Sequence, residues 1–350
     1  MAESRIAHSS RRGRRAKTSG QDGSGGEAVN TSPVAAGSDR DPGAHLTAKR
    51  VHIGKYGLDV GPLGHLAAER ARLAALSWQS FDARPLGATI GAELRGVDLT
   101  SDLPDEVIDE IRRALHAYKV IFFRDQPLTA AQHVAFARRF GDLEIHPFIP
   151  SNTGQPELVR FEKSADVGGY ENGWHHDVTW RERPSMGAVL HALRVPQNGG
   201  DTLFADMCAA YDGLDDATRE QIDDLVAVHD YAQVFGHVVQ KEKRAEMRAT
   251  YPTVEHPVAC THDATGRRHL YVNRFFTSHV VGFDEAESTA LIDRLARRAE
   301  IAEYQCRFQW EDHSVGFWDN RAVQHYAASD YWPDVRVMER ASIVGERPRR

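Results

Sequence analysis

The chain has 350 residues, of which 41% are hydrophobic and 27% are charged, a composition typical of soluble globular proteins with one large domain or two small ones. Its formal net charge of -7 at pH 7 gives it no general electrostatic attraction to nucleic acid or to an anionic membrane. We therefore expect a small-molecule substrate, with neither nucleic acid nor a membrane as partner.

The cysteines and the apolar runs indicate the cellular compartment. Cys208, Cys260 and Cys306 lie far apart, and their odd number and lack of C-x-x-C spacing fit neither a disulfide framework nor a zinc site. The chain begins without the apolar run of a signal peptide, and it has no stretch of about 18 or more apolar residues. These features predict a cytoplasmic protein.

The first 50 residues differ in kind from the rest. They are rich in Gly, Ser, Ala and Arg, and they carry nine Arg and Lys against five Asp and Glu. Such a segment has too few large apolar residues to build a core. Residues 1–50 are therefore predicted to form a disordered basic tail, which we interpret as a solvated extension in preference to a docking segment. Residues 51–80 are expected to form a lead-in that is helical around residues 66–76, before a folded domain over residues 81–348.

Helical and strand-like patterns alternate irregularly along this domain. Helical periodicity predicts helices over residues 105–117, 130–140 and 284–299. Runs rich in β-branched and aromatic residues predict strands over residues 120–123, 188–195, 270–272, 314–318 and 341–344. Gly199-Gly200-Asp201 is expected to form a turn between two strands. Clustered strands with helical insertions favour an α+β fold with a mainly β core over a repeating βαβ pattern.

One short segment carries a candidate metal-binding pair. In the β-prone, aromatic-flanked run from Gly173 to Trp180, His175 and Asp177 are two positions apart, and in a strand such residues point to the same face. Iron oxygenases commonly hold Fe(II) by two His and one carboxylate, which leaves coordination positions open. The spacing alone favours a plain strand with two polar residues on its solvent face over a metal site.

A second segment, Trp318 to Ala327, is followed by Arg336 and Arg340. Together with the His175 segment it resembles the taurine dioxygenase (TauD/TfdA-like) family of Fe(II)- and 2-oxoglutarate-dependent dioxygenases, from about Phe81 to Pro348. The stretches that match in order are residues 87–99, 120–125, 140–147, 174–179, 199–202, 256–258, 271–273 and 318–327. The resemblance implies a double-stranded β-helix, or jelly roll, with flanking helices.

The resemblance also implies the cofactor site. His175, Asp177 and His325 look like the three Fe(II) ligands. Arg336 resembles the residue that binds the far carboxylate of 2-oxoglutarate, a role for which the planar guanidinium suits Arg, and Thr202 resembles its hydroxyl partner. Trp318 resembles an aromatic beside the iron, although a packed indole fits it as well.

Several further residues resemble the substrate pocket of the family. Arg340 and His146 match residues that hold the anionic group of the substrate, and the even offset between Arg336 and Arg340 would keep both on one face of a strand. Phe235 and Phe276 match apolar pocket walls, with core packing as the alternative.

Two positions depart from the taurine pattern. Glu171 stands where taurine dioxygenase has an amide that contacts the amine of taurine, and Ile149 replaces a nearby tyrosine. A carboxylate could pair with an ammonium, but it is costly to bury unpaired, so the substrate can differ from taurine at this end. His176 is expected to face away from the metal, and His313 to lie in an exposed loop.

These matches predict an oxidoreductase that hydroxylates a small organic anion with O2 and 2-oxoglutarate and releases succinate and CO2. A taurine-like alkyl sulfonate is the first expectation, and its hydroxylated product would break down to an aldehyde and sulfite. An alkyl sulfate, an aryloxyalkanoate or a natural-product carboxylate is the alternative substrate, and a metal-binding barrel without turnover is the remote one. A homo-oligomer, dimer or tetramer, is expected because many such enzymes are oligomers.

Overall fold

The computed structural model describes residues 50–350 except residues 54, 56, 57, 150, 153 and 170. Every described residue belongs to one unit of the chain, residues 42–350. The predicted disordered tail, residues 1–50, lies outside the described residues apart from Arg50.

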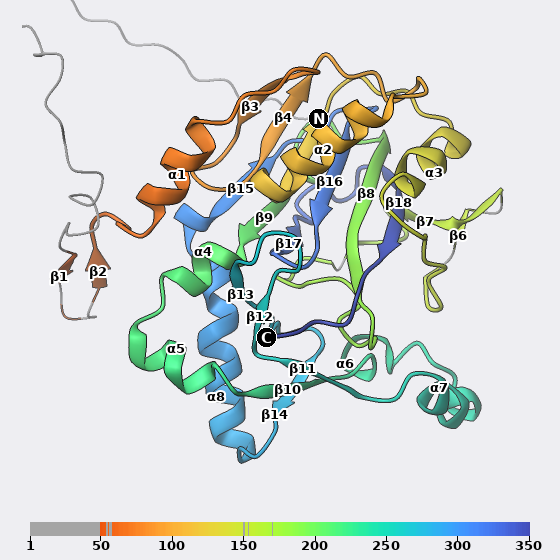
Figure 1. The fold of residues 1–350 in the computed structure, drawn as a ribbon. Coiled ribbons are helices and arrows are strands. Elements are labelled where there is room, and N and C mark those ends of the chain that lie inside the picture. Colours follow the sequence, from red (N-terminus) through yellow and green to blue (C-terminus); the bar gives the residue numbers. More distant parts are fainter. Residues whose placement is uncertain (1–49, 54, 56–57, 150, 153, 170) are drawn as a thin grey trace, which may run out of the picture. The chain divides into compact units, whose positions relative to one another are not determined.

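The described residues form a mixed α and β structure with extensive sheet (Figure 1). The strands are β1 (Val51–Ile53), β2 (Leu58–Val60), β3 (Asp82–Pro85), β4 (Ala92–Arg95), β5 (Val120–Phe123), β6 (Ser151–Asn152), β7 (Gln155–Lys163), β8 (Ser185–Arg194), β9 (Thr202–Asp206), β10 (Val226–His229), β11 (Val254–Pro257), β12 (Ala259–Thr261), β13 (Arg268–Leu270), β14 (Thr277–Val280), β15 (Gln305–Phe308), β16 (Val315–Asp319), β17 (Val323–Ala327) and β18 (Arg336–Val344). The α-helices are α1 (Leu66–Ala74), α2 (Asp105–Tyr118), α3 (Ala130–Arg138), α4 (Met207–Asp212), α5 (Asp216–Ile222), α6 (Ala232–Phe235), α7 (Arg244–Thr250) and α8 (Glu285–Ala296).

The largest sheet has eight strands in the order β3-β4-β5-β16-β8-β18-β7-β6. Every residue of β5 is apolar because both faces of this strand are covered and alternate residues point to opposite faces. Ile121 and Phe123 belong to the cluster that the helices cover, whereas Val120 and Phe122 belong to the cluster inside the fold. The predicted strand over residues 120–123 is confirmed.

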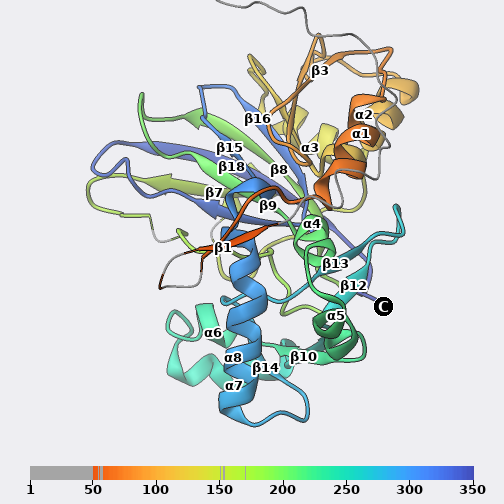
Figure 2. The same cartoon turned by 90° about the vertical axis from the view of Figure 1, so that its left-hand side faces the viewer.

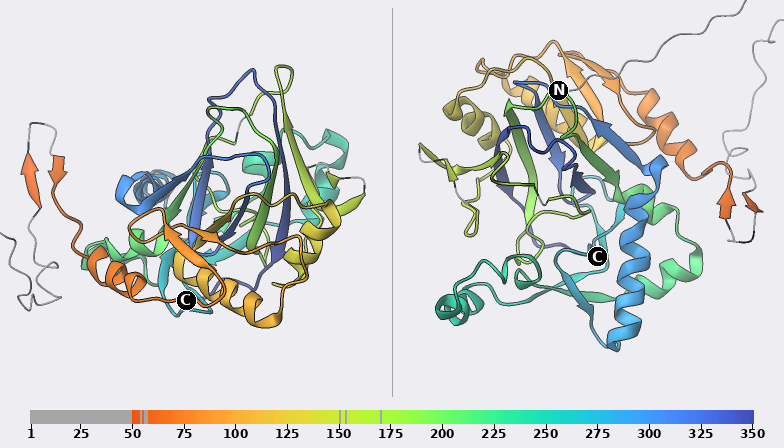
Figure 3. Two further views of the ribbon diagram at one scale, coloured as in Figure 1. Left: turned by 90° about the horizontal axis from the view of Figure 1, so that it is seen from above. Right: turned by 180° about the vertical axis from the view of Figure 1, so that it is seen from behind.

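A second sheet of three strands, in the order β15-β9-β17, closes the other side of this interior. Phe204 of β9 and Phe308 of β15 pack in the same buried cluster as Phe122, and the rings of Phe122 and Phe308 are stacked at 3.8 Å. Figure 3 shows strands that are distant in the sequence, coloured green and blue, lying next to one another. The two sheets therefore share one aromatic core.

Helices α2 and α3 cover the outer face of the large sheet (Figures 1 and 3). Helix α2 begins with Asp105 and Glu106, whose charges favour the positive end of the helix dipole, and it ends where Lys119 adopts a left-handed φ of 66°. Its buried Ile108, Ile111 and Leu115 follow the helical spacing of three to four residues. The predictions of helices over residues 105–117 and 130–140 are confirmed, the second with an earlier end.

Another group of elements lies beyond one end of the two sheets, as Figure 2 shows for α5, α7, α8 and β10. They include the sheet β11-β10-β14, the pair β12-β13 and helix α8, which confirms most of the helix predicted over residues 284–299. Within the described part of the chain, every helix is too short or too polar to span a bilayer.

One local prediction is wrong. The residues from Gly173 to Trp180 do not form a strand, because His175 makes only an isolated β-bridge to His325 and the chain turns from Asp177 onward. Val178 has a left-handed φ of 49°, an uncommon conformation for a β-branched residue. Asp177 and His175 therefore do not share a face of one strand, and another geometry must bring them together.

Candidate metal centre and active site

Three side chains converge where β17 meets the turn after His175. The backbone of His175 and His325 is joined by two hydrogen bonds of 3.1 and 2.9 Å, and Asp177 follows in the turn. Nε2 of His175 lies 3.7 Å from Oδ1 of Asp177, and Nε2 of His325 lies 3.9 Å from Oδ2. One ligand atom from each residue lies within 4.8 Å of the others, a separation that a single ion can bridge.

The orientation of His175 is fixed from two sides. Its Nδ1 lies 2.7 Å from the carbonyl oxygen of Gly173, and a carbonyl only accepts, so Nδ1 carries the proton and Nε2 is left with a lone pair. Phe275 stacks on the imidazole at 4.7 Å. A side chain at position 173 would meet that ring at 2.2 Å, so only glycine fits there.

The charges of the three residues suit a divalent cation. Burial lowers the pKa of His175, and it lowers the pKa of His325 to about 3, so both imidazoles are neutral and able to donate a lone pair at neutral pH. Burial raises the pKa of the Asp177 carboxyl, but opposing charges, first that of the nearby Arg340 guanidinium, hold that pKa well below its usual range. Two neutral imidazoles and one carboxylate form a donor set that fits Fe(II).

His176 points elsewhere, as the sequence predicts. It is fully buried, its ring lies 4.9 Å from that of Tyr271, and it is absent from the one metal-ligand group found among the described residues. His313, the other histidine set aside, is exposed in a loop with a left-handed φ of 64°.

A small cavity beside His325 contains Thr202, Trp318 and Arg336. Arg336 is 7% exposed, and its Nε and Nη2 have no hydrogen-bond partner among the residues that the structure describes. Burial lowers the pKa of this Arg, and such a guanidinium is strongly destabilised unless an anion joins it. Thr202 Oγ1 accepts a hydrogen bond of 2.9 Å from Trp310 Nε1, so its own hydroxyl hydrogen is available to an acceptor in the cavity.

Trp318 lies at the same end of this cavity as the candidate ligands. Its indole is buried, and its ring centre is 5.0 Å from that of His325. It also packs against Phe204, so it contacts a candidate ligand and the core at once.

A larger cavity of about 730 Å³ opens on the other side of His175. The residues predicted for the substrate pocket all line it: His146, Glu171, Phe235, Phe276 and Arg340, together with Ile149. Phe276 is buried, and its ring centre is 6.1 Å from that of Phe235. The two rings therefore belong to the cavity wall and to an aromatic cluster at once.

His146 presents one defined nitrogen to this cavity. Its Nδ1 accepts hydrogen bonds from the backbone N–H groups of Phe148 and Ile149 at 3.2 and 3.1 Å. Burial lowers the pKa of His146 to about 3, so the ring is neutral and its proton resides on Nε2. A neutral N–H donor is then available to an anion.

Arg340 lies between the cavity and the candidate metal ligands. Its Nη1 is 2.9 Å from both carboxylate oxygens of Asp177, while its Nε has no partner within the described part of the chain. Strands β18 and β7 pair so that Arg336 is opposite Lys163 and Arg340 is opposite Val159. The even offset keeps both Arg residues on one face, as the sequence predicts.

The comparisons with known proteins agree with this geometry. Residues 82–342 match the model of the family described as "Taurine catabolism dioxygenase TauD, TfdA family". The chain belongs to this family. The family predicted from the sequence is thereby confirmed.

Individual relatives cover most of the chain. A sulfate ester dioxygenase of Pseudomonas putida that depends on alpha-ketoglutarate is 35% identical over 77% of this chain and 91% of its own length. An alkylsulfatase of Acinetobacter baylyi is 34% identical over 77% and 86%. The crystal structure of a taurine dioxygenase from Burkholderia xenovorans is 36% identical and superimposes with a TM-score of 0.67, covering 77% of this chain and 93% of that one.

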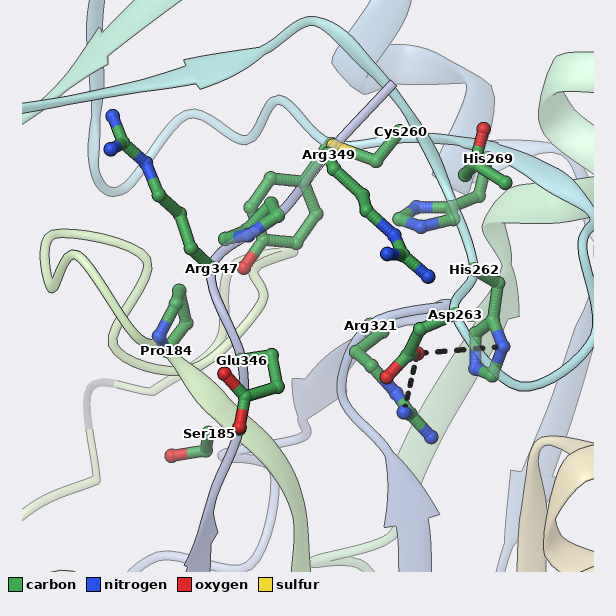
Figure 4. Close-up of a pocket in the computed structure, with 14 residues that line it drawn as sticks. Pro184, Ser185, Cys260, His262, Asp263, His269, Arg321, Glu346, Arg347 and Arg349 are labelled. Carbon is green, nitrogen blue, oxygen red and sulfur yellow. Dashed lines mark hydrogen bonds and ion pairs between the residues drawn. The ribbon is translucent and has the colours of Figure 1, made fainter.

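A further cavity of about 310 Å³ lies apart from the residues predicted for the site of this TauD/TfdA protein. Figure 4 shows that His262, Asp263 and Arg321 meet there, with Asp263 in contact with His262 and in an ion pair with Arg321. His262 Nε2 and Arg321 also contact the buried carboxylate of Asp319 at 2.9 and 2.6 Å. This network anchors the end of β16, directly before the turn that leads to His325.

Several residues at the site of this family member are missing from the sequence-based prediction. Lys163 lines both cavities, Phe275 stacks on His175, and Trp310 donates to Thr202. Each of these residues contacts a site residue that is distant in the sequence or lies across a turn. The only local signal is the aromatic pair Phe275-Phe276, of which the prediction used the second residue.

Proposed function

We propose that residues 81–348 form a double-stranded β-helix dioxygenase domain that holds Fe(II) through His175, Asp177 and His325. The convergence of two neutral imidazoles and one anionic carboxylate within 4.8 Å carries this proposal. The two sheets that enclose one core support the proposed barrel.

The same proposal places 2-oxoglutarate in the small cavity. The guanidinium of Arg336 would pair with its far carboxylate, which explains a buried cation with two nitrogens that lack partners among the described residues. Thr202 would donate its hydroxyl hydrogen to the same carboxylate. Together, bound Fe(II) and 2-oxoglutarate supply an O2-dependent oxidation that yields succinate and CO2 and hydroxylates a C–H bond of the substrate.

The substrate is a small organic anion with a sulfonate or sulfate group, bound in the larger cavity by Arg340 and by the Nε2–H of His146. The names of the relatives support this class, since two concern sulfate esters and one concerns taurine. The protein orients one C–H bond beside His175 and Asp177 while the aromatic wall excludes water. With a sulfonate the products would be an aldehyde and sulfite. An aryloxyalkanoate or another carboxylate is the alternative.

A cytoplasmic location and a dimeric or tetrameric state stay predictions. Size-exclusion chromatography coupled to light scattering measures the second directly. A non-catalytic barrel, the remote alternative, predicts no succinate at all.

The test of the function is succinate formation from 2-oxoglutarate under air with Fe(II), for the wild type and for His325→Ala. We expect the variant to lose nearly all activity, because one of three candidate ligands is gone. His313→Ala, which changes an exposed loop residue, is the matched control and should keep wild-type activity. Equal activity of the wild type and His325→Ala would overturn the assignment of the ligands.

A further inference from the structure

Lys163 and Glu171 form an ion pair at the boundary of the two cavities. Nζ of Lys163 lies 2.9 Å from Oε1 of Glu171, and both residues line the small cavity and the larger one. The Lys163 side chain is 9% exposed and that of Glu171 is 29% exposed. The carboxylate at the position where taurine dioxygenase has an amide is therefore already joined to a cation of this chain.

The surroundings make this pair hard to exchange. Lys163 is on β7, directly opposite Arg336 on β18, and Arg340 lines the same two cavities. If a substrate ammonium took Glu171 away, the Lys163 ammonium would remain in a nearly buried position beside two guanidinium groups. Taking the carboxylate away from the Lys163 ammonium of a shielded ion pair is strongly unfavourable. The incoming ammonium would also face the repulsion of the Lys163 cation.

Part of the wall of the larger cavity suits an uncharged tail, although Arg160, Glu162 and Arg274 also line this cavity. Val178, Val234, Phe235, Phe275 and Phe276 form an apolar wall of it. Phe235 lies next to His146, with ring centres 5.6 Å apart, so the tail of an anion bound at His146 would meet this wall. Apolar surface of this kind gains free energy when it is covered by carbon chains, and it offers an ammonium no hydrogen-bond acceptor. A cavity of about 730 Å³ also leaves room for a tail longer than that of a two-carbon sulfonate.

We propose that Lys163 is a specificity-determining residue: its ion pair with Glu171 takes the place of a substrate ammonium and directs the enzyme to anions with an uncharged tail. This inference rests on the function proposed above and makes it more specific. It assigns sulfonates and sulfate esters with aliphatic tails as the preferred substrates, and it assigns amino-terminated ones such as taurine as poor substrates.

Two pairs of nearly isosteric anions test the inference. Taurine and propane-1-sulfonate differ by an ammonium in place of a methyl group, and so do 2-aminoethyl sulfate and propyl sulfate. For each anion, kcat/KM is measured by succinate formation, and Kd is measured by calorimetry with the 2-oxoglutarate-loaded protein under nitrogen. We expect the wild type to prefer the uncharged member of each pair by about tenfold or more.

Variants of the pair then separate charge from shape. Lys163→Met removes the Lys163 cation from Glu171, and we expect the preference to fall by about tenfold or to reverse. Lys163→Arg keeps a cation on Glu171 and should keep the preference. Glu171→Gln removes the carboxylate and should strengthen the rejection of the ammonium. If Lys163→Met does not fold, the preference of the wild type still decides the matter.

The outcomes distinguish a failure of the role of Lys163 from a failure of the proposed function. Turnover of both members of a pair with a wild-type ratio near one, or an unchanged ratio in a folded Lys163→Met, would overturn the role of Lys163 alone. If none of the four anions were bound or turned over, the proposed substrate class and the inference would both fall.

Discussion

The side chain of Asn320 forms hydrogen bonds with both the backbone N–H and the backbone carbonyl of Asp177. Oδ1 of Asn320 accepts a hydrogen bond from the Asp177 N–H at 2.7 Å, and Nδ2 donates to the Asp177 carbonyl at 3.0 Å. Nδ2 also donates to the carbonyl of Ser185 at 3.0 Å. The carboxylate that we assign to the metal is thereby fixed in a turn where Val178 has an unfavourable φ.

Asn320→Ala is expected to weaken metal binding without removing a ligand. It leaves the N–H and carbonyl of Asp177 unpaired in a buried site, so the turn loses its defined geometry. Loss of such an outer contact lowers metal affinity by about 10- to 100-fold. Titration with Mn(II) or Co(II), followed by calorimetry, measures it.

Asn172→Ala is the control, since Asn172 is exposed three residues before His175. It should bind metal like the wild type. An unchanged metal affinity in a folded Asn320→Ala would mean that Asn320 does not position Asp177.

Arg336→Lys is expected to raise the KM for 2-oxoglutarate by about tenfold to a hundredfold, because an ammonium cannot form the forked pair of hydrogen bonds of a guanidinium. The KM for the organic anion should change far less. Arg307→Lys is the matched control: Arg307 lies on β15, pairs with Asp201, and has a side chain that is 54% exposed. If both variants shift the KM for 2-oxoglutarate equally, Arg336 does not bind it.

Arg340→Ala is expected to impair oxidation of the organic anion more than oxidation of 2-oxoglutarate. With Fe(II) at saturation, the apparent KM for propane-1-sulfonate should rise about a hundredfold, as expected for loss of one partner of a buried charge pair. Saturating metal is needed because Arg340 also contacts Asp177. Arg160→Ala changes a more exposed Arg that lines the same cavity and should alter this KM only slightly. Undiminished turnover of the anion in Arg340→Ala would remove Arg340 from that role.

The sequence predicts the regular elements well where local patterns determine them. Helix α2 follows from its amphipathic spacing and acidic first turn, and β5 follows from its uninterrupted apolar run. The even offset between Arg336 and Arg340 correctly places both on one face of β18.

The same local logic fails at His175 and Asp177. Strand periodicity predicts a shared face, whereas the two side chains meet because His175 bridges His325, which is 150 positions away. The Lys163–Glu171 and Trp310–Thr202 contacts likewise depend on tertiary packing, and one sequence contains no local signal for them. Only the ordered family resemblance pointed to the three candidate ligands.

Buried histidines make the stability of this fold depend on pH. His133 of α3 is fully buried, and its Nε2 lies 3.0 Å from the carbonyl of Val189. Burial lowers the pKa of His133 from 6.5 to about 3. Between these two values the unfolded chain binds a proton that the folded chain does not, so the free energy of unfolding falls as the pH falls through this window.

His133→Gln should reduce this pH dependence. The amide can still donate to the carbonyl of Val189, but it does not titrate, so the slope of stability against pH between about 4 and 6 should decrease by up to about 1.4 kcal/mol per pH unit. Urea unfolding at several pH values measures the slope, and His279→Gln, at an exposed position of β14, is the control. The variant's lower packing quality shifts stability at every pH alike, whereas only loss of the titrating group changes the slope. A slope equal to that of the wild type would show that His133 does not contribute to acid unfolding.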